Sequence, residues 1–511
     1  MITRMFTLAA LAAFSLSTPS CQEKSDPTPF QPTWESLAKA KPATWWDQGK
    51  FGIFIHWGPY SVAGYKLHHS GYAEAITTHM YQVPEKYEPF FKEKFGACPP
   101  EFGYKDWIQL YTAQHWNPQQ WAQLFQQAGA KYVILSAEHH DGFANWDSKL
   151  TPWCATKMGP KRDLVGDLAK AVRQQGLHYG VSYHRERHPN RFAKTFAIQS
   201  EPMPLVAEEI KRDPQCAELY GPFSYSDAFI ADYVARWKEL ETLYAPDFMW
   251  IDNIPIFNHA QGHPQTLKFQ DAYKHMIADY LNAAAACGKE VFFNNKGKTP
   301  NFPLGVGCLE KDNMSTSEII KDRWQNPATL GVSYAYMHNE EVNDLYKTPA
   351  ELIRLLVDVV SKNGNLLLNI GPRADGTIPE GMQRRLLAMG KWLAANGAAI
   401  YGTTPWRVYG ECSGDIITEP DVHYNKHSMR VHQKEYRYTA KDNNIYATTF
   451  QYEDQPFVLK SFKDYQGQIE KVTTIDGKDI EFSLTAEGLK LTDKAPKEDF
   501  FLAKVYQIYT R

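Results

Sequence analysis

The sequence predicts an α/β protein: a (β/α)8 TIM-like barrel with a C-terminal antiparallel β-sandwich domain. Over residues 45–404, short apolar runs alternate with amphipathic helical patterns, as in a parallel sheet or barrel. About eight such runs can be distinguished, and a closed barrel of this type needs eight strands. Over residues 405–511 the helical spacing disappears. Short alternating stretches separated by turns take its place, which is typical of a sandwich.

Two helices show how the element boundaries are predicted. Asn117 is placed to cap a helix whose apolar residues share one face until Gly129 ends it. Asp163 caps a second helix in the same way, and Gly176 ends that helix. An apolar run follows each helix directly, so the order of helix and strand repeats as it does in a barrel.

The strand candidates are short apolar runs between turn residues. They lie at residues 51–55, 131–136, 177–183, 247–251, 290–294, 306–309, 332–336 and 365–370, with 306–309 the weakest. In a barrel the reactive groups lie where the strands end and the following loops begin. Polar residues directly after each run are therefore the candidates for a functional site.

The composition excludes several classes of protein. The chain has 511 residues, of which 43% are hydrophobic and 22% charged, so it is globular and long enough for two or three domains. Its 55 basic and 58 acidic residues give a formal net charge of -3, and no long run of either sign occurs. Nucleic acid is therefore not expected as a partner. The seven cysteines form no C-x-x-C pair, so neither a zinc site nor a disulfide framework is predicted.

Residues 1–21 have the layout of a secretory signal peptide, with an apolar run at 5–16 that is too short to span a bilayer. The run is followed by Cys21, which would carry the lipid of a bacterial lipoprotein and anchor the chain in a membrane. Thr18 stands where such a signal usually has an aliphatic residue, so plain cleavage nearby is the alternative. Residues 22–44 form a leader before the barrel. We expect export across the inner membrane, to the periplasm or to the outer-membrane or cell surface of a bacterium.

Asp252 is the strongest candidate for a catalytic residue. It follows the apolar run that ends in Trp250 and Ile251, so its carboxylate emerges from a buried strand beside a large aromatic surface. Such a carboxylate can attack the anomeric carbon of a sugar and form a covalent glycosyl-enzyme intermediate. The alternative from the sequence alone is an Asp at the barrel rim that caps the next helix or pairs with a lysine.

Three histidines follow strand candidates: His56 and the adjacent pair His139 and His140. The pair invites a metal site, but adjacent strand residues point to opposite faces and no acidic ligands accompany the pair at chelating spacing, so no metal is expected. Two neutral imidazoles suit hydrogen bonds to sugar hydroxyls better. Taken alone, His56 would more often be a satisfied core histidine, and its neighbour Trp57 would more often fill the core.

Five motifs occur in a fixed order along the chain. They are KFGIFIHWGPYSV at 50–62, HHDGF at 139–143, GPKRDL at 159–164, WID at 250–252 and SKNGNLLLNIGP at 361–372. Through these motifs, residues 45–406 resemble glycoside hydrolase family 29, the α-L-fucosidases. The resemblance implies an enzyme without a cofactor that releases terminal α-L-fucose, or a closely related L-sugar, from an oligosaccharide or glycoconjugate.

The resemblance also implies a retaining mechanism in two steps. An Asp attacks the anomeric carbon while a Glu protonates the leaving oxygen and then activates water. Asp252 matches the nucleophile. The residues expected to bind the substrate are His56, Trp57, Glu74, His139, His140, Tyr183, Trp250 and Lys296.

The acid implied by the resemblance lies on a loop of variable length in the family. Glu310 best matches a Trp-Glu segment that precedes the family's Trp-Gly-Tyr, which corresponds here to residues 333–336. The intervening segment is longer than usual in this chain. Glu318 is therefore a second candidate for the acid.

Three departures from the family bear on the substrate. The family's Glu-Trp-Tyr is Glu74 followed by Ala75 and Ile76, so an aromatic wall is missing. The family's Asn-Asp-Arg ends in Lys296, which cannot make the two-pronged contact of a guanidinium. Residues 182–188 are unusually basic, and form either a solvated loop or a subsite for an anionic or larger neighbour such as a sulfated glycan.

Two alternatives to a fucosidase follow from these departures. One is an α-L-galactosidase of the same family, because L-galactose is L-fucose with a hydroxyl on the exocyclic carbon, and Ala75 makes room for it. The other is a sugar-binding protein that keeps the barrel without catalysis, against which the presence of Asp252 argues. The oligomeric state, the linkage and the aglycone stay open.

Overall fold

The computed structural model describes most of the chain. The described residues are 29–67, 71–252, 262–296, 303, 305–314, 316–412, 417–419, 428–430, 435–452, 455–497 and 501–511. The predicted signal peptide, with Cys21, lies outside them. Within these ranges, no helix combines the length and the apolar composition that a membrane crossing requires.

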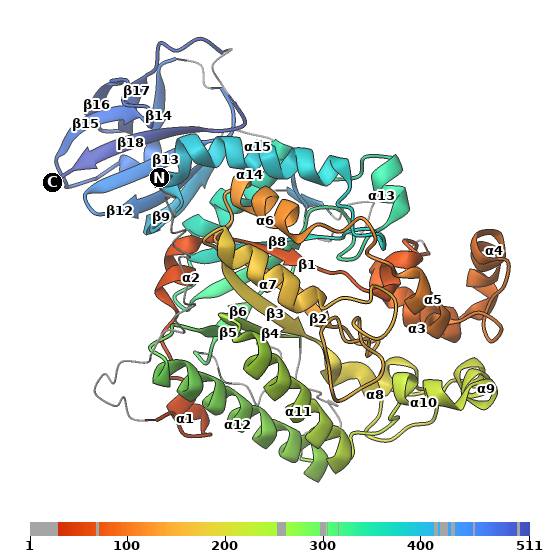
Figure 1. Ribbon diagram of the computed structural model, residues 1–511. Helices are drawn as coiled ribbons and strands as arrows, with labels where there is room; N and C mark the ends of the chain where they lie inside the picture. The colour runs from red at the N-terminus through yellow and green to blue at the C-terminus, as the bar shows by residue number, and fades with distance from the viewer. Residues whose placement is uncertain are drawn as a thin grey trace, which may run out of the picture.

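Eight parallel strands close into a barrel at the centre of the molecule (Figure 1). They are β1 (Phe51–Ile55), β2 (Tyr132–Glu138), β3 (His178–Tyr183), β4 (Phe248–Ile251), β5 (Phe292–Asn295), β6 (Cys308–Glu310), β7 (Trp324–Thr329) and β8 (Gly364–Ile370). Each strand pairs with the next one along the chain, and β1 pairs with β8 to complete the ring. The predicted fold class is confirmed.

Long helices cover the outside of the barrel (Figure 1). They are α6 (Pro118–Gln127), α7 (Leu164–Gln174), α11 (Asp227–Tyr244), α12 (Pro264–Ala286), α14 (Pro349–Ser361) and α15 (Glu380–Asn396). The predicted caps of α6 and α7 are confirmed, because Asn117 accepts a hydrogen bond from the backbone N of Gln120 and Asp163 accepts one from Gly166.

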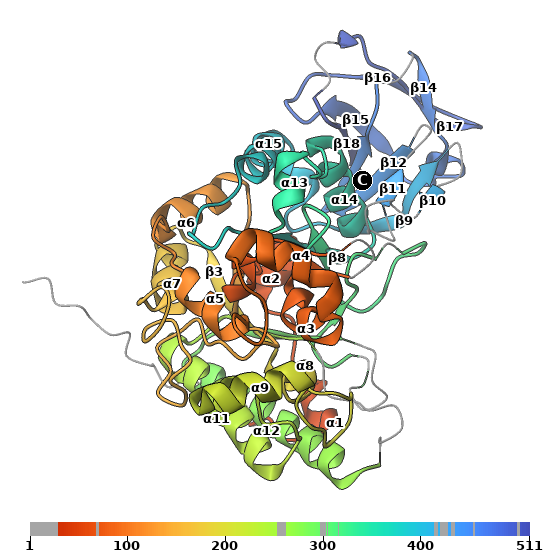
Figure 2. The same ribbon diagram turned by 90° about the vertical axis from the view of Figure 1, so that its right-hand side faces the viewer.

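Shorter helices follow β1 and β3 and gather on one side of the barrel, which faces the viewer in Figure 2. They are α3 (Ile76–Gln82), α4 (Pro84–Phe95), α5 (Tyr104–Leu110), α8 (His188–Arg191), α9 (Pro204–Arg212) and α10 (Ala217–Tyr220), with the 3-10 turns η1 (Pro59–Val62), η2 (Ala73–Ala75), η3 (Arg185–Arg187) and η4 (Pro214–Cys216). Elsewhere lie α1 (Trp34–Leu37), α2 (Thr44–Gly49), α13 (His338–Val342), η5 (Gly397–Ala399) and η6 (Lys460–Phe462).

One predicted strand is wrong. Residues 332–336 form a buried loop, and the seventh strand is β7, which the sequence hides because it contains Gln325, Asn326 and Pro327. Gln325 is tolerated inside the barrel because its amide is fully used. Its Oε1 accepts hydrogen bonds from Nε1 of Trp46 at 3.0 Å and from the hydroxyl of Tyr132 at 2.6 Å.

Large apolar side chains fill the barrel below its carboxyl end. Trp46 of α2, Phe54, Tyr132, Phe248 and other inward-facing residues form one buried cluster. Such layers of side chains make the interior of a barrel a packed core and not a channel. The carboxyl ends of the strands, beyond this packed layer, are therefore where a site can form.

Antiparallel sheets form the C-terminal region, next to α14 and α15 (Figure 1). Their strands are β9 (Thr404–Cys412), β10 (Ile417–Glu419), β11 (Ser428–Arg430), β12 (Glu435–Lys441), β13 (Asn444–Thr449), β14 (Phe457–Leu459), β15 (Ile469–Thr474), β16 (Glu481–Thr485), β17 (Gly488–Thr492) and β18 (Lys504–Thr510). A five-stranded sheet in the order β15-β18-β13-β12-β9 shares an apolar core with the three-stranded sheet β14-β17-β16. The region is attached to the barrel in part by Arg437 of β12, whose Nε lies 2.7 Å from Oδ1 of Asp358 in α14.

Candidate active site

A cavity of about 300 Å³ lies at the mouth of the barrel, and the first residue after each of the strands β1 to β5 lines it. These residues are His56, His139, His184, Asp252 and Lys296. Because neighbouring parallel strands end side by side, these side chains meet although they are far apart in the sequence. The cavity is also lined by Phe54, Tyr72, Glu74, Ala75, His140, Arg187, Arg191, Trp250, Asp312, Pro327 and Tyr334.

Asp252 carries an ionised carboxylate surrounded by nitrogen atoms. Its Oδ1 lies 3.2 Å from Nζ of Lys296. Its Oδ2 lies 3.3 Å from Nε2 of His140 and 3.9 Å from Nε of Arg187. Burial alone would raise the pKa of Asp252, but these neighbours, Lys296 above all, outweigh burial and hold the pKa well below its usual range. The carboxylate is therefore ionised near neutral pH, as a nucleophile must be.

Lys296 bridges two carboxylates. Besides its contact with Asp252, its Nζ lies 2.5 Å from Oδ2 of Asp312. Burial would lower the pKa of Lys296, but Asp312 and Asp252 raise it above its usual range, so the ammonium group stays charged. The same Nζ lies 4.6 Å from the ring centroid of Trp250, a cation–π contact that holds the lysine against the wall of the cavity.

His140 presents a defined ring nitrogen to Asp252. Its Nδ1 lies 2.6 Å from the backbone oxygen of His184, and a carbonyl oxygen can only accept, so Nδ1 carries a proton and donates it. Burial lowers the pKa of His140, which favours the neutral ring, although Asp252 acts in the opposite direction. Nε2 of His140, which lies 3.3 Å from Oδ2 of Asp252, is the ring nitrogen that faces the carboxylate and the cavity.

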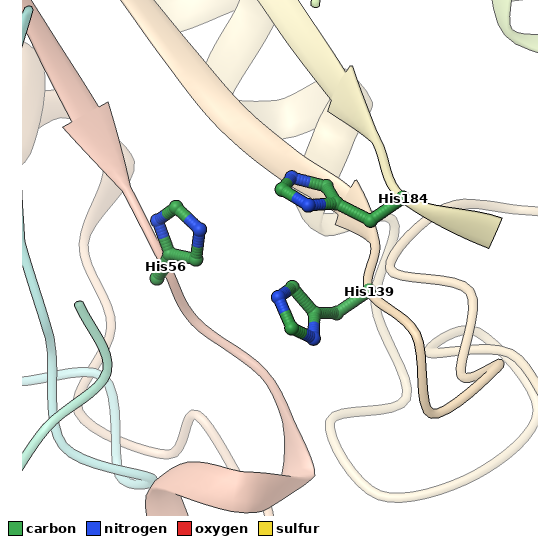
Figure 3. A group of neighbouring side chains, drawn as sticks. All are labelled: His56, His139 and His184. Carbon is green, nitrogen blue, oxygen red and sulfur yellow. The ribbon is translucent and has the colours of Figure 1, made fainter. Parts of the chain in front are cut away.

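His56, His139 and His184 form a compact group in the cavity (Figure 3). The ring centroids of His139 and His184 lie 4.7 Å apart, and His56 lies 5.6 Å from His139 and 5.4 Å from His184. Burial lowers the pKa of His56 to about 4 and the pKa values of His139 and His184 well below their usual range. All three rings are therefore neutral near pH 7 and can donate and accept hydrogen bonds.

Glu74 is buried beside the cavity, at η2. Its Oε2 accepts a hydrogen bond from the backbone N of Ala335 at 3.1 Å and one from Oγ of Ser333 at 3.4 Å. Burial raises the pKa of Glu74, against these hydrogen bonds. The contacts tie η2 to the loop after β7, which carries Tyr334 into the cavity. The next residue, Ala75, contributes only a methyl group to the wall.

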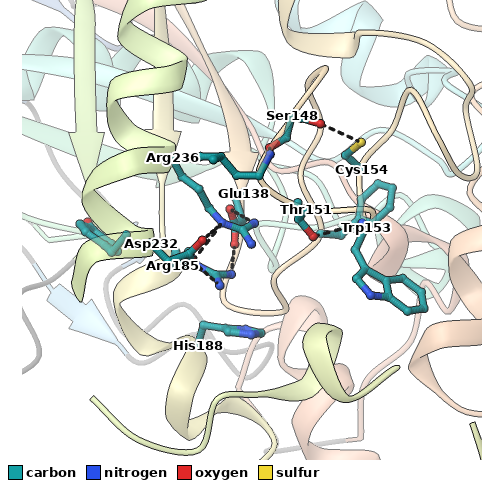
Figure 4. Close-up of polar contacts among 12 residues, drawn as sticks. Glu138, Ser148, Thr151, Trp153, Cys154, Arg185, His188, Asp232 and Arg236 are labelled. Atoms are coloured by element: carbon teal, nitrogen blue, oxygen red, sulfur yellow. Dashed lines mark hydrogen bonds and ion pairs between the residues drawn. The ribbon is translucent and has the colours of Figure 1, made fainter. Parts of the chain in front are cut away.

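A buried ion-pair network joins Glu138, at the end of β2, to residues of η3 and α11 (Figure 4). Arg185 places Nη1 2.6 Å from Oε1 of Glu138 and Nη2 2.8 Å from Oδ2 of Asp232. Arg236 in α11 contacts the same two carboxylates, at 3.3 Å and 3.1 Å. The cavity histidines adjoin Glu138 and Arg185 in the sequence. The network therefore fixes the ends of β2 and β3 from which those histidines project.

Two residues expected at the site lie outside the cavity. Trp57 donates from Nε1 to the backbone oxygen of Arg373 at 2.8 Å and packs among other aromatic rings, so it fills the core. The hydroxyl of Tyr183 donates to the backbone oxygen of Tyr233 at 3.1 Å, on the helix side of the sheet. The expectation for Tyr183 was one residue out of register, because adjacent strand residues point to opposite faces and His184 faces the cavity.

Neither candidate for the acid lies in the cavity. Glu310 is buried beneath Trp250, and its Oε1 accepts hydrogen bonds from Nε1 of Trp250 and from Nε2 of Gln325, both at 3.0 Å. Glu318 is exposed on the loop between β6 and β7. The carboxyl group that lines the cavity after β6 is Asp312, two residues beyond Glu310. The short sequence motif led to Glu310 and missed Asp312. The position of Asp312 shortly after a predicted strand end is the more useful signal in the sequence.

Only some residues of the basic segment 182–188 reach the cavity. His184 and Arg187 line the cavity, whereas Arg185 turns away into the ion-pair network. Arg191 of α8 also lines the cavity, and its Nε donates to Oγ1 of Thr77 at 3.0 Å. No feature of the sequence marked Arg191, because it reaches the cavity from a helix beyond the strand ends.

Comparisons with known proteins find similar sequences and a similar fold. A family model described as Alpha-L-fucosidase matches residues 17–398. The tissue alpha-L-fucosidase of Bos taurus is 33% identical over 404 residues, which cover 76% of this chain and 75% of the relative. The plasma alpha-L-fucosidase of Homo sapiens is 33% identical over 404 residues, covering 78% and 76%. The crystal structure of Thermotoga maritima alpha-fucosidase is similar with a TM-score of 0.73 at 30% identity, covering 94% of this chain and all of that one.

The position of Glu310 predicts a pH-dependent stability. Burial raises the pKa of Glu310 well above its usual range, against the charge of Lys296, whereas an unfolded glutamate titrates near about 4.3. The folded state thus holds the proton more tightly. The resulting stabilisation is complete below about pH 4.3 and is lost as the pH rises through the folded pKa. Between about pH 5 and about pH 8, the free energy of unfolding should fall in the wild type by at least about 1 kcal/mol more than in Glu310→Gln.

Denaturant unfolding at the two pH values measures this difference. Glu318→Gln is the matched control, because the side chain of Glu318 is exposed, and it should follow the wild type. Equal pH dependence in the wild type and in Glu310→Gln would show that Glu310 is ionised in the fold.

Proposed function

The chain belongs to the α-L-fucosidase family of glycoside hydrolases, and we propose that it releases terminal α-L-fucose from fucosylated glycans by a retaining mechanism, with Asp252 as the nucleophile. One observation carries the proposal: an ionised carboxylate at the end of β4, with a second carboxylate beside it. Both Oδ1 of Asp252 and Oδ2 of Asp312 contact Nζ of Lys296, so these oxygens lie within about 6 Å of each other. Retaining glycosidases hold their two carboxyl groups roughly 5 to 5.5 Å apart.

The reaction takes place in two displacements. In the first, an oxygen of Asp252 attacks the anomeric carbon, the bond to the leaving oxygen breaks, and protonated Asp312 gives its proton to that oxygen. In the second, Asp312 takes a proton from water. The water oxygen attacks the same carbon, and the bond to Asp252 breaks, which frees fucose with its original anomeric configuration.

Lys296 supports both steps because it contacts both carboxylates. While Asp312 carries the proton, the ammonium group pairs with Asp252 alone and keeps the nucleophile ionised. Once Asp252 has become an ester, it has no charge, and the ammonium group stabilises ionised Asp312, the form that takes a proton from water. A compact ammonium group suits this alternation because it needs no fixed two-pronged geometry.

The neutral histidines suit the ring hydroxyls of the sugar. The histidines that line the cavity are His56, His139, His140 and His184. In His56 and His140 the Nδ1–H group already donates to a protein oxygen, so Nε2 is the nitrogen left for a hydroxyl group. Nε2 of His140 lies beside the nucleophile, so we assign it to the hydroxyl on the carbon next to the anomeric centre. Trp250 supplies the flat apolar wall against which one face of a sugar ring packs.

We also propose that the chain acts after export, as the layout of residues 1–21 indicates. Lipid attachment at Cys21 would keep the enzyme at a bacterial membrane surface, where fucosylated glycans from outside the cell arrive. Plain cleavage near Cys21 would release it to the periplasm.

A second candidate activity is the hydrolysis of α-L-galactosides, and the position of Ala75 favours it. Ala75 lines the cavity with a methyl group where the family has a tryptophan. L-Galactose differs from L-fucose by one added hydroxyl, and an apolar pocket rejects such a group only weakly, whereas a tight aromatic wall excludes it by size.

Asp252→Asn should lower kcat for an aryl α-L-fucoside by at least about a thousandfold, because an amide cannot act as the nucleophile. The fold should persist, as circular dichroism can check. Asp271→Asn is the matched control, since Asp271 is an exposed residue of α12, and its kcat should equal that of the wild type. A retained activity above about a tenth of wild type would refute the role of Asp252.

Asp312→Asn should discriminate between leaving groups. Without the acid, a fucoside with a poor leaving group should react about a hundredfold to ten-thousandfold more slowly, whereas a nitrophenyl fucoside needs little proton donation. Azide should restore turnover of the nitrophenyl substrate by attacking the glycosyl-enzyme without a general base. Glu310→Gln should lack this pattern, and its appearance in Glu310→Gln and not in Asp312→Asn would reverse the assignment.

Ala75→Trp tests the second activity. Wild type should hydrolyse both the aryl α-L-fucoside and the aryl α-L-galactoside, and the tryptophan should raise the ratio of kcat/KM for fucoside over galactoside by about tenfold or more. Ala75→Ser leaves the wall small and serves as the control. A wild-type enzyme without activity on the galactoside would limit the chain to fucosides.

A further inference from the structure

Three successive strands of the barrel each deliver a histidine at the same level, and we propose that His56, His139 and His184 together bind a divalent transition metal ion such as Zn²⁺. Each is the first residue after its strand, β1, β2 or β3. One nitrogen of each ring lies within 4.8 Å of the chosen nitrogens of the other two. Their rings point toward one another (Figure 3).

The spacing is close to what a tetrahedral ion requires. Zinc binds imidazole nitrogen at about 2.0 to 2.1 Å, so three ligand nitrogens on one ion lie roughly 3.3 Å apart. From separations of at most 4.8 Å, small rotations of the three side chains bring the nitrogens to that distance. A water molecule or an oxygen of a ligand would take the fourth position, as in zinc sites with three histidines.

The outer hydrogen bond of His56 fixes which of its ring nitrogens is available. Nδ1 of His56 lies 2.6 Å from Oδ1 of Asn369. Nδ2 of Asn369 donates to the backbone oxygen of Tyr334 at 2.7 Å, which sets the orientation of the amide. Oδ1 is thus the acceptor, Nδ1 of His56 carries the proton, and Nε2 keeps its lone pair for the ion. This arrangement, with the second nitrogen donating to an oxygen, is typical of metal-binding histidines.

His184 has a similar outer partner. Its Nε2 lies 2.8 Å from Oγ of Ser182, two residues earlier on β3, so its Nδ1 is left for the cavity. The rings of His139 and His184 lie at 38° to each other and face the same space.

Some charges near the three histidines favour the binding of a cation, and others oppose it. A ring nitrogen of His184 also lies within 4.8 Å of a carboxylate oxygen of Asp252 and a nitrogen of His140, so a cation here has a carboxylate close by. Lys296 and Arg187 also contact Asp252, and their positive charges repel a divalent ion. We therefore expect zinc to bind with micromolar affinity, more weakly than it binds to structural zinc sites.

The ion and the sugar would occupy the same place. This part of the inference rests on the proposed function, in which the same imidazoles hold ring hydroxyls. A bound ion takes the lone pairs that would accept hydrogen bonds from the sugar, so zinc and fucose should exclude each other. Zinc would then act as a competitive inhibitor.

Isothermal titration of the full chain with ZnCl2 tests the metal site directly, without any sugar. One ion should bind per chain, and His184→Ala and His139→Ala should each weaken binding by at least about a hundredfold. His275→Ala is the matched control, because this histidine is 60% exposed on α12, and it should bind as the wild type does. An affinity equal in the wild type and both cavity variants, or no binding at one ion per chain, would overturn the site.

Anomalous scattering at the zinc edge would locate the ion in crystals, and density bridging the three rings is the expected result. Adding L-fucose to the titration should weaken zinc binding in proportion to the occupancy of the sugar. If zinc binds to the three histidines and fucose leaves its affinity unchanged, the shared position is refuted and the metal site stands. The loss of turnover in Asp252→Asn is measured without zinc, so failure of the proposed function is recognised separately.

Discussion

The pairing of β1 with β8 is the contact on which the site depends. It turns a row of parallel strands into a ring, in which Phe51 lies opposite Leu366 and Ile55 opposite Ile370. Only in a closed ring do the ends of β1 and β5 face each other across one opening. The imidazole of His56 and the ammonium group of Lys296, which follow those two strands, can therefore line one small cavity.

Electrostatics then divides the cavity into two parts. On one side, the ammonium group of Lys296 contacts the carboxyl groups of Asp252 and Asp312, and it holds the pKa of Asp252 well below its usual range. On the other side, burial removes the charge from the imidazoles, so that they offer lone pairs and N–H groups. Asp252 is therefore ionised and His56 neutral, although burial disfavours the charged form of both. They differ because, within the described part of the chain, an opposite charge lies within hydrogen-bonding distance of Asp252 and not of His56.

The barrel and the position of Asp252 in the cavity could be predicted from the sequence because both depend on local patterns: the alternation of runs and helices, and a polar residue at the end of a buried run. β7 could not, since its polar residues resemble a loop until the hydrogen-bonding partners of Gln325 inside the barrel are known. Tyr183 was expected where His184 lies, because a shift of one residue reverses the face of a strand. Asp312 was missed because the motif match led to Glu310, whereas the cavity is set by distance from the strand end.

The buried pair of Glu138 and Arg185 limits how this sequence can evolve. Replacing either residue alone would leave this buried network of two arginines and two carboxylates with one uncompensated charge, at a cost of several kcal/mol. A lineage can exchange the pair only by passing through a destabilised intermediate or by changing both codons together. The two positions should therefore change together among descendants of this chain. Ala75 contributes only a methyl group to the wall of the cavity, so this position can change alone.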